Sequence, residues 1–483
     1  MHELTGDQEV VLKLLRETIH QLSRDQPKTR KRAMKTLGLT SESKFPAERD
    51  RIVEELQRAL NRERPRKTPG TGFAAGFAGS AEKATEAEQG PWYHPRDRTV
   101  ALFQSAMDEY LDQRAGKEAK ARKKKTFAKQ DAGKTREAQA ATAAKPAETI
   151  DLFFAEKSTK RPDKGKAPTP MGLVGEQFSD LDPGWVEVVV AKIGLAFTGK
   201  AKFIVHKSVT DFRNGLEDPV KIALVSDWGG GNDAAKLVAQ QIAAHEPDHV
   251  IHLGDVYYAG TTPEVQKRFL ALWPAGRLSS FALNSNHEMY TGGKAYFGTT
   301  LKKFGQPASY FSLGNKNVRF IGLDTGYVDH NLNKEQVEWL GAQLKTGPDK
   351  TILLSHHQMF SAFEGGDPVR DPESTSGAAL ERWLKPFLDA NKIYAWFWGH
   401  EHRCIVYDSF KGIQARCVGH GCFPYNVPPD PPDYPDVPVK WVNRRKQDNG
   451  EGMHGFALLT IDGSSIHVDY IDQDGTVSFN EDL

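Results

Sequence analysis

The fold follows from three apolar runs, KIALVSD (221–227), HVIHLGD (249–255) and SFALNSN (280–286). Each run has the length of a buried strand and ends on a polar side chain. The segments that separate them, one from Asp233 to His245 and one beginning at Glu264, have helical length and spacing. This alternation predicts layers of helix packed on sheet. Side chains that carry function in such sheets lie at the strand ends.

The same pattern continues along the chain. Three further runs end on residue types that bind metals or phosphates: VRFIGLDT (318–325), TILLSHH (351–357) and IYAWFWGH (393–400). After Cys404 no helical segment is predicted, and four runs indicate a closing antiparallel sheet: IVYDSF (405–410), IQARCVGH (413–420), FALLTID (456–462) and SIHVDYID (465–472). We therefore expect a second sheet to pack on the first. Upstream, the runs at 185–193 and 201–206 are also predicted strands.

The first part of the chain has a different character. Apolar side chains at helical spacing predict three amphipathic helices, at 8–23, at 48–61 and after Pro95; the stripes consist of Val11, Leu15, Ile19 and Leu22, then Ile52, Leu56 and Leu60, then Val100, Phe103, Met107 and Leu111. None of these helices carries a chemical motif. We expect a small helical region at 1–62, then a Gly/Pro-rich linker with one amphipathic helix at 63–115.

Charge separates the two parts of the chain. Residues 1–170 hold 35 Lys/Arg and 25 Asp/Glu, a net charge of +10, whereas the remainder holds 29 and 38, a net charge of −9. The segment 116–171 is rich in Lys and Ala and poor in large apolar residues, which predicts a flexible basic linker. Such an arm attracts nucleic acid, but no aromatic side chains interleave its lysines as a stacking platform would require.

Composition excludes a membrane protein. No apolar run approaches the roughly 20 residues that span a bilayer, and 26% of the residues are charged. The polar, acidic first ten residues do not resemble an export signal, so we expect a cytoplasmic protein. The three cysteines, Cys404, Cys417 and Cys422, are an odd number in a long chain and indicate reduced thiols.

Five polar clusters follow the strand-like runs in order: SDWG (226–229), GDVYY (254–258), SNHE (285–288), SHH (355–357) and GHEH (399–402). Two cations about 3.5 to 4 Å apart need one shared carboxylate, further oxygen and imidazole ligands, and room for a bridging water. The five clusters supply that set. They therefore predict a dinuclear metal centre.

Each cluster also has a structural reading of its own. Asp227 could cap the helix that begins near Asn232, Asp255 could satisfy backbone N–H groups in a turn, and Tyr258 could be a core aromatic. Histidines at strand ends are often only hydrogen-bonded. The occurrence of all five clusters in one chain, each at a strand end, favours one metal site over five coincidences.

The five clusters resemble the signature of the metallophosphoesterase, or calcineurin-like phosphoesterase, superfamily. The form DxG, GDxxY, NHE, xxH and GHxH is similar to its purple acid phosphatase branch, which has a tyrosine in the second cluster and lacks a histidine at the position of Gly229. The resemblance covers roughly residues 219–479. It implies a four-layer α/β/β/α sandwich for a catalytic domain at 172–483, preceded by the helical region and the basic linker.

The resemblance also implies the ligands. Asp255 would bridge two metals, with Asp227, Tyr258 and His402 on the first and Asn286, His356 and His400 on the second. A phenolate such as Tyr258 suits iron(III), and the second site suits iron(II), zinc or manganese. Phosphate esters would then be hydrolysed by attack of a metal-bound hydroxide.

The resemblance leaves two candidates for the group that protonates the leaving oxygen. His287 matches the histidine that contacts the substrate phosphate. Family members carry further histidines shortly after the fourth cluster, but the segment that follows His357 here contains none before His400. His357 is therefore the second candidate, with a buried, hydrogen-bonded histidine as the structural alternative.

The leading hypothesis is an acid-phosphatase-like phosphomonoesterase that acts on a phosphate-ester substrate. One alternative is a phosphodiesterase or nuclease that uses the basic linker to hold a nucleotide or nucleic acid. Another is a regulatory adaptor whose N-terminal helices bind a protein partner and whose metal domain is secondary. We expect residues 1–171 to be dispensable for small substrates, unless their helices complete the core of the catalytic domain.

Overall fold

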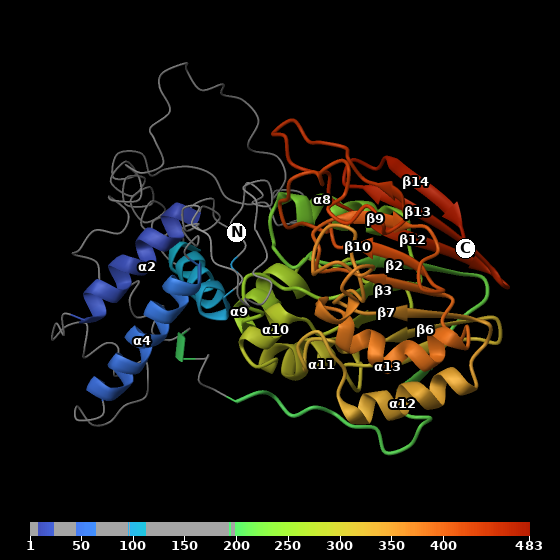
Figure 1. Cartoon of the computed structure of the whole chain (residues 1–483), viewed down its shortest axis with the longest axis horizontal. Coiled ribbons are helices and arrows are strands. Elements are labelled where there is room, and N and C mark those ends of the chain that lie inside the picture. The colour runs from blue at the N-terminus through green and yellow to red at the C-terminus, as the bar shows by residue number, and fades with distance from the viewer. Residues whose placement is uncertain (1–7, 24–44, 64–94, 96, 113–192, 195–198) are drawn as a thin grey trace, which may run out of the picture.

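The computed structural model describes residues 8–23, 45–63, 95, 97–112, 193–194 and 199–483 (Figure 1). The predicted basic linker at 116–171 lies outside the described residues, as does most of the predicted linker before Pro95. Of the predicted strand at 185–193 only Ile193 is described, and it is helical. Among the helices that the structure describes, none combines the length and the apolar character needed to cross a membrane.

Two mixed sheets form the large domain. The eight-stranded sheet has the order β1 (Arg213–Gly215), β5 (Phe311–Gly314), β6 (Val318–Gly322), β7 (Lys350–Leu354), β8 (Ala395–Trp398), β10 (Gln414–Val418), β9 (Cys404–Tyr407), β11 (Val439–Val442). The six-stranded sheet has the order β14 (Val477–Asp482), β13 (Ser465–Asp472), β12 (Gly455–Asp462), β2 (Val220–Val225), β3 (His249–His252), β4 (Ser279–Ala282).

Helices cover the outer faces of the two sheets, as the sequence predicts. The main ones are α8 (Asp233–Ala244), α12 (Lys334–Lys345) and α13 (Ala378–Asp389); shorter helical segments are α9 (Thr262–Glu264), η4 (Val265–Leu270), α10 (Asn286–Tyr290), η5 (Tyr296–Thr300), α11 (Leu301–Phe304) and η6 (Pro372–Ser374). Asn232 caps α8, since its side chain accepts a hydrogen bond from the Ala235 N–H at 3.1 Å. Asp227 therefore does not serve as this cap.

Side-chain alternation along the strands builds the four layers. In β2, Ile222 and Leu224 belong to the core between the two sheets, whereas Ala223 and Val225 belong to the core under the helices. Figure 1 shows α12 and α13 side by side beneath the eight-stranded sheet, with α8 on the far side of the six-stranded one. The order helix, sheet, sheet, helix confirms the predicted α/β/β/α sandwich.

The C-terminal strands differ from the prediction of one closing sheet. β9, β10 and β11 extend the eight-stranded sheet, whereas β12, β13 and β14 complete the six-stranded one, with β12 antiparallel to β2. Alternating apolar residues predict that a strand is half buried, but they do not say which sheet it joins.

The segment at 201–206, predicted as a strand, is extended but pairs with no strand in the described part of the chain. Its main-chain groups bond instead to loops and side chains: Ala201 N donates to Gly292 O at 2.7 Å, and the Tyr327 hydroxyl donates to Ala201 O at 2.9 Å. Phe203 stacks on Tyr310 with ring centroids 5.6 Å apart. The apolar pattern here reflects packing of Phe203 against Tyr310 and Tyr327 rather than strand pairing.

The N-terminal helices form a small bundle with its own core. It consists of α2 (Gln8–Ser23), α4 (Phe45–Glu63) and the helix at 98–112. The apolar stripes predicted from the sequence face one another inside it; Leu15 and Leu56, for example, are fully buried. The stripes that suggested a binding face for a protein partner are thus occupied within the chain.

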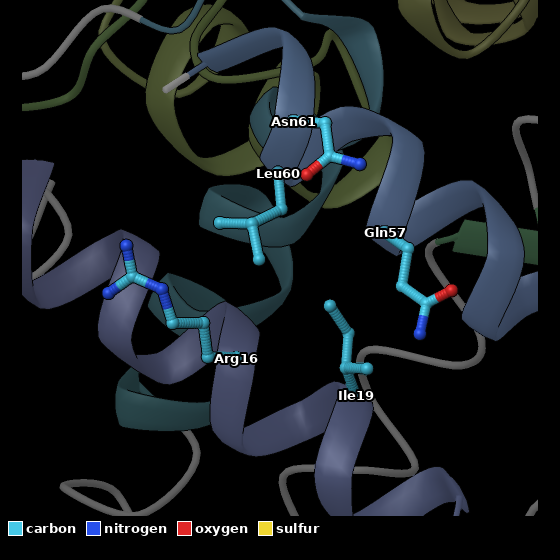
Figure 2. A pocket seen from close by; sticks show the side chains of 5 residues that line it. All are labelled: Arg16, Ile19, Gln57, Leu60 and Asn61. Atoms are coloured by element: carbon cyan, nitrogen blue, oxygen red, sulfur yellow. The ribbon is translucent and has the colours of Figure 1, made fainter. Parts of the chain in front are cut away.

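The bundle core reaches the large domain. It includes Ala259, and Tyr290 packs against it. Figure 1 shows the helix at 98–112, drawn in cyan, next to α9 and α10. A hollow of about 320 Å³ remains between α2 and α4, lined by Arg16, Ile19, Gln57, Leu60 and Asn61 (Figure 2). These residues are distinct from every polar cluster that the sequence predicts to be functional.

Candidate metal centre

The ends of five strands bring the polar clusters together. Asp227, Asp255 and Asn286 follow β2, β3 and β4, which run parallel in the six-stranded sheet. His356 and His400 follow β7 and β8, which run parallel in the other sheet. Since parallel strands end at one edge, both sheets present their polar residues at the same side of the sandwich.

Asp227, Asp255 and His402 form one group of possible metal ligands, with one ligand atom of each within 4.8 Å of the others. His402 Nε2 lies 3.4 Å from Asp227 Oδ1. Both carboxylates are almost completely buried, and His402 is partly exposed. This group coincides with three of the four ligands predicted for the first metal.

A second group consists of Asp255, His356 and His400, again within 4.8 Å. His356 Nε2 lies 3.2 Å from Asp255 Oδ1, 3.1 Å from Asn286 Oδ1 and 3.2 Å from His400 Nδ1. All four residues predicted to surround the second metal therefore meet at one point. Asp255 belongs to both groups, as a bridging ligand requires.

The phenol near these groups is that of Tyr257. Its hydroxyl donates to Asp227 Oδ1 at 2.9 Å or Asp255 Oδ2 at 3.1 Å and lies 2.9 Å from His402 Nε2. The sequence predicts Tyr258 in this role, but Tyr258 contributes main-chain groups here: its N–H donates to Glu264 at 2.6 Å and its carbonyl faces His287 Nδ1 at 2.6 Å. Of the two neighbours, Tyr257 is the residue whose side chain contacts the carboxylates.

Backbone conformation at the site is unusual. Four of the predicted ligands have positive φ: Asp227 at 56°, Asp255 at 75°, His400 at 69° and His402 at 46°. Non-glycine residues rarely adopt this region, and such residues concentrate at functional sites. These positive φ values reverse the chain directly after the strands, at the edge where the side chains gather.

Two glycines allow the loops to approach closely. A Cβ at Gly399 would lie 2.6 Å from Asp227 Oδ2, so only glycine lets His400 N donate to that oxygen at 2.9 Å. A Cβ at Gly229 would lie 2.7 Å from Val256 Cα. The position of Gly229 therefore has no room for a side chain.

The two buried carboxylates titrate in opposite directions. Burial raises the pKa of Asp255 well above its usual range, and the charges of Asp227 and Glu288 raise it further. Burial also opposes ionisation of Asp227, but its contacts with His402 and His356 hold its pKa below the usual range overall. Two carboxylates this close ionise together only with added positive charge, so the site fits bound cations.

The imidazoles are prepared to bind a metal as neutral ligands. Burial lowers the pKa of His356 to about 4 and that of His400 well below its usual range. His356 Nδ1 is held by the Leu253 carbonyl at 3.0 Å, which leaves Nε2 facing the site. Anchoring one ring nitrogen while presenting the other is the usual arrangement of metal-ligating histidines.

Two glutamates hold the ligand-bearing loops. Glu264 accepts hydrogen bonds from the main-chain N–H groups of Tyr258, Ala259 and Thr261 at 2.6 to 3.2 Å. Glu288 accepts one from Asp255 N at 3.3 Å, and burial raises its pKa to about 7. Neither glutamate stands out as a support from sequence alone.

The two predicted catalytic histidines lie on opposite sides of the centre. His287 is buried, with Nε2 3.8 Å from Asp255 Oδ2 and its ring against that of Tyr257. His357 is buried beside His356 and His400, with ring centroids 4.8 Å from each. His330, which sequence reasoning missed, packs against His357 with ring centroids 3.9 Å apart and the rings tilted by 40°. Its only signal is its place after VRFIGLDT, a run that ends like the ligand-bearing strands.

The geometry agrees with a comparison of the sequence with protein families. Residues 220–404 match the model described as calcineurin-like phosphoesterase. The chain contains a calcineurin-like phosphoesterase domain. No curated protein sequence matches the chain.

Solved structures that are similar to this chain include the following three. One is GAP50, described as the anchor in the inner membrane complex of Plasmodium, with 15% identity over 55% of this chain and 89% of that chain and a TM-score of 0.42. A purple acid phosphatase from yellow lupin (Lupinus luteus) seeds has 17% identity, 56% and 54% coverage and a TM-score of 0.40. A dimetal phosphatase from Danio rerio has 13% identity, 55% and 99% coverage and a TM-score of 0.38. At these identities the likenesses assign no substrate.

Proposed function

We propose that the phosphoesterase domain binds two metal ions and hydrolyses phosphate esters, with monoesters as the first substrate class to test. The observation that carries the proposal is the pair of ligand groups that share Asp255. A buried carboxylate between two sets of neutral imidazole and carboxylate ligands is the arrangement that a dinuclear centre needs.

The ligand sets differ in hardness. Asp227, Asp255, His402 and the Tyr257 phenol would hold the first ion, and with a phenolate ligand iron(III) fits best. Asp255, Asn286, His356 and His400 would hold the second, for which iron(II), zinc or manganese fits. Relative to the sequence prediction, the phenol passes from Tyr258 to Tyr257. Two such cations lower the pKa of a water and neutralise the phosphate oxygens as negative charge develops.

His287 is our first choice for the group that transfers a proton to the leaving oxygen. Its Nδ1 is fixed 2.6 Å from the Tyr258 carbonyl, so Nε2 faces Asp255 and the centre. Burial lowers the pKa of His287 to about 3, which makes it neutral without substrate. A phosphate bound beside it would raise that pKa and allow Nε2 to carry the proton.

The bridging carboxylate provides the test. Asp255→Asn should abolish p-nitrophenyl phosphate turnover and lower the metal content measured by elemental analysis, because the two cations lose their shared anionic ligand. Asp248→Asn is the matched control. Asp248 is a buried aspartate at the opposite end of β3, where it accepts from Lys221 N at 2.9 Å.

Two bound metals and normal turnover in Asp255→Asn would disprove the assignment. Bis-p-nitrophenyl phosphate, assayed in parallel, measures diester hydrolysis. A faster diester reaction would place the enzyme in the phosphodiesterase or nuclease class instead.

A further inference from the structure

A second cluster of histidines lies beside the dinuclear centre. His330, His357 and His400 each offer a ring nitrogen, and these three nitrogens lie within 4.8 Å of one another. The ring centroids are separated by 3.9 Å between His330 and His357, 4.8 Å between His357 and His400, and 5.2 Å between His330 and His400. Only His400 belongs to the ligand set proposed above.

His357 shows that the cluster is incomplete without a further group. The residue is fully buried, and its Nε2 has no hydrogen-bond partner among the described residues. The Asp329 carboxylate lies 3.9 Å from this nitrogen, too far for a hydrogen bond. Buried polar atoms in folded proteins are almost always satisfied. An unpartnered nitrogen on a ring whose centroid lies 3.9 Å and 4.8 Å from those of two other imidazoles therefore indicates a ligand.

The other ring nitrogens of His330 and His357 are anchored. His357 Nδ1 lies 2.9 Å from Thr325 Oγ1, and His330 Nδ1 lies 3.0 Å from Asp329 Oδ1. When each Nδ1 carries the proton, each Nε2 presents a lone pair. A carboxylate bonded to the second ring nitrogen of a histidine, as Asp329 is to His330 Nδ1, is the partner that orients and strengthens imidazole ligands of zinc.

The backbone conformation at His330 also resembles that of the predicted metal ligands. His330 has a φ of 52°, which it shares in sign with the four predicted ligands Asp227, Asp255, His400 and His402. The loop that carries it is held by Asp324, whose Oδ1 accepts from Gly326 N at 3.1 Å and Tyr327 N at 2.8 Å. His330 is thus placed by a fixed turn rather than by a free loop.

We propose that His330, His357 and His400 form a third metal site, suited to zinc. Two neutral imidazoles and the imidazolate of His400, with water in the remaining position, match the coordination that zinc prefers. His400 Nδ1 already lies 3.2 Å from His356 Nε2 in the dinuclear centre, so Nε2 is the nitrogen available to the third ion. Coordination through both nitrogens releases the ring proton of His400 to solvent.

The third site goes beyond the proposed function and does not depend on turnover. It would place an additional positive charge on the His330 side of the centre, away from His287. The site would be filled or empty whether or not the dinuclear pair hydrolyses a phosphate ester. Metal counting can therefore separate the two proposals.

The test is equilibrium dialysis of the full chain, stripped with a chelator and reloaded with zinc alone, followed by elemental analysis. We expect three zinc ions per wild-type chain, two in His330→Ala, and three in the control His467→Ala. His467 is a histidine of β13 that pairs with Asp482 at 2.7 Å and lies outside both clusters. Asp329→Asn should keep the site but weaken zinc binding by about 10- to 100-fold.

Three outcomes would overturn the third site: two ions in both wild type and His330→Ala, an unchanged three in His330→Ala, or an unchanged affinity in Asp329→Asn. The variant Asp255→Asn separates this result from the proposed function. If it loses the dinuclear pair, one zinc should remain, and adding His330→Ala should remove it. Fewer than two ions in the wild type would count against the dinuclear centre itself.

Discussion

The helical bundle and the two-sheet domain bury apolar side chains equally well, but they relate to the metal ligands in different ways. Among the described residues, the two-sheet domain supplies every candidate ligand, from its strand ends and, for His330, from a loop. The described helices of the bundle supply none, yet the bundle contacts the loops that carry the ligands. Arg98 Nε of the bundle donates to Tyr290 O at 2.6 Å, at the end of the helix that begins with Asn286.

A buried ion pair makes the second connection. Asp108, fully buried in the bundle, pairs with Arg268 of η4. Arg268 Nη1 in turn donates to the Tyr257 carbonyl at 3.1 Å. Burial lowers the pKa of Arg268 to about 10, which leaves it charged at neutral pH. A region without a chemical motif can therefore position the residues of a region that has one.

Removing the bundle is the strongest test of whether it positions the ligand-bearing loops. Deletion of residues 1–171 uncovers Ala259, Tyr290 and Arg268, and the loop after Asp255 loses its packing. We expect p-nitrophenyl phosphate turnover to fall by more than about tenfold, since displacements of about 1 Å can cost roughly a hundredfold. The measurement is kcat and KM of the soluble fragment beside the full chain.

The sequence alone predicts that this fragment keeps its activity within about tenfold. Retained activity, together with an unchanged thermal midpoint, would show that the bundle only lies beside the domain. Failure of the fragment to fold would agree with a shared core. In that case the variants Asp108→Asn and Asp108→Asn with Arg268→Met test the contact between the two regions in the full chain.

A smaller change breaks only the ion pair. Asp108→Asn leaves Arg268 charged and buried, and removing one partner of a buried pair typically costs about 3 to 5 kcal/mol. We expect a loss of unfolding free energy of about 3 kcal/mol in urea denaturation, the lower end of that range. Adding Arg268→Met should recover part of the loss, because the buried cation left by Asp108→Asn is removed, whereas Glu264 loses its 3.8 Å contact with Arg268.

The control for this prediction is an exposed pair in the same bundle. Arg58 and Glu54 lie 3.0 Å apart with more than half of each side chain exposed. Glu54→Gln should change the unfolding free energy by less than about 0.5 kcal/mol. Equal effects of Glu54→Gln and Asp108→Asn would mean that the buried pair does not join the two regions.

The smallest change removes one hydroxyl and tests which of the two tyrosines in the loop after Asp255 binds the first metal. After aerobic loading with iron, a phenolate bound to iron(III) should give a visible absorption band. Tyr257→Phe should remove the band, because the Tyr257 hydroxyl is the one that contacts Asp227 and Asp255. Tyr258→Phe is the matched control, one residue away and equally buried, and should keep the colour.

The reverse result would return the ligand to Tyr258, as the sequence predicts. Absence of a band in the wild type, with two irons bound under oxidising conditions, would exclude both tyrosines. Because either substitution removes a single hydroxyl, folding should be little affected in both variants.

Sequence reasoning predicts the sandwich and the approximate site because both rest on local signals. Asp227, Asp255, His356 and His400 each follow an apolar run, and parallel strands must bring such ends to one edge. The structure places these residues together as the strand pattern requires.

The parts that sequence reasoning missed depend on information that is not local. Tyr257 and Tyr258 are adjacent and chemically identical, so only the path of the backbone decides which hydroxyl reaches Asp255. His330 lies on a loop, where spacing gives no direction to a side chain. Apolar stripes predict that the N-terminal helices are buried, but the contact with Ala259 and Tyr290 depends on tertiary packing.

The place of β12 has a consequence for biosynthesis. This strand, Gly455–Asp462, pairs with β2, the strand that leads to Asp227, and joins it to β13 and β14. The ribosome delivers β2 long before β12, so the six-stranded sheet cannot close until the segment from β12 to β14 has emerged. Pairing between such distant segments is slow, and β2 exposes an open edge in the meantime. The nascent chain therefore depends on protection from aggregation until its last strands arrive.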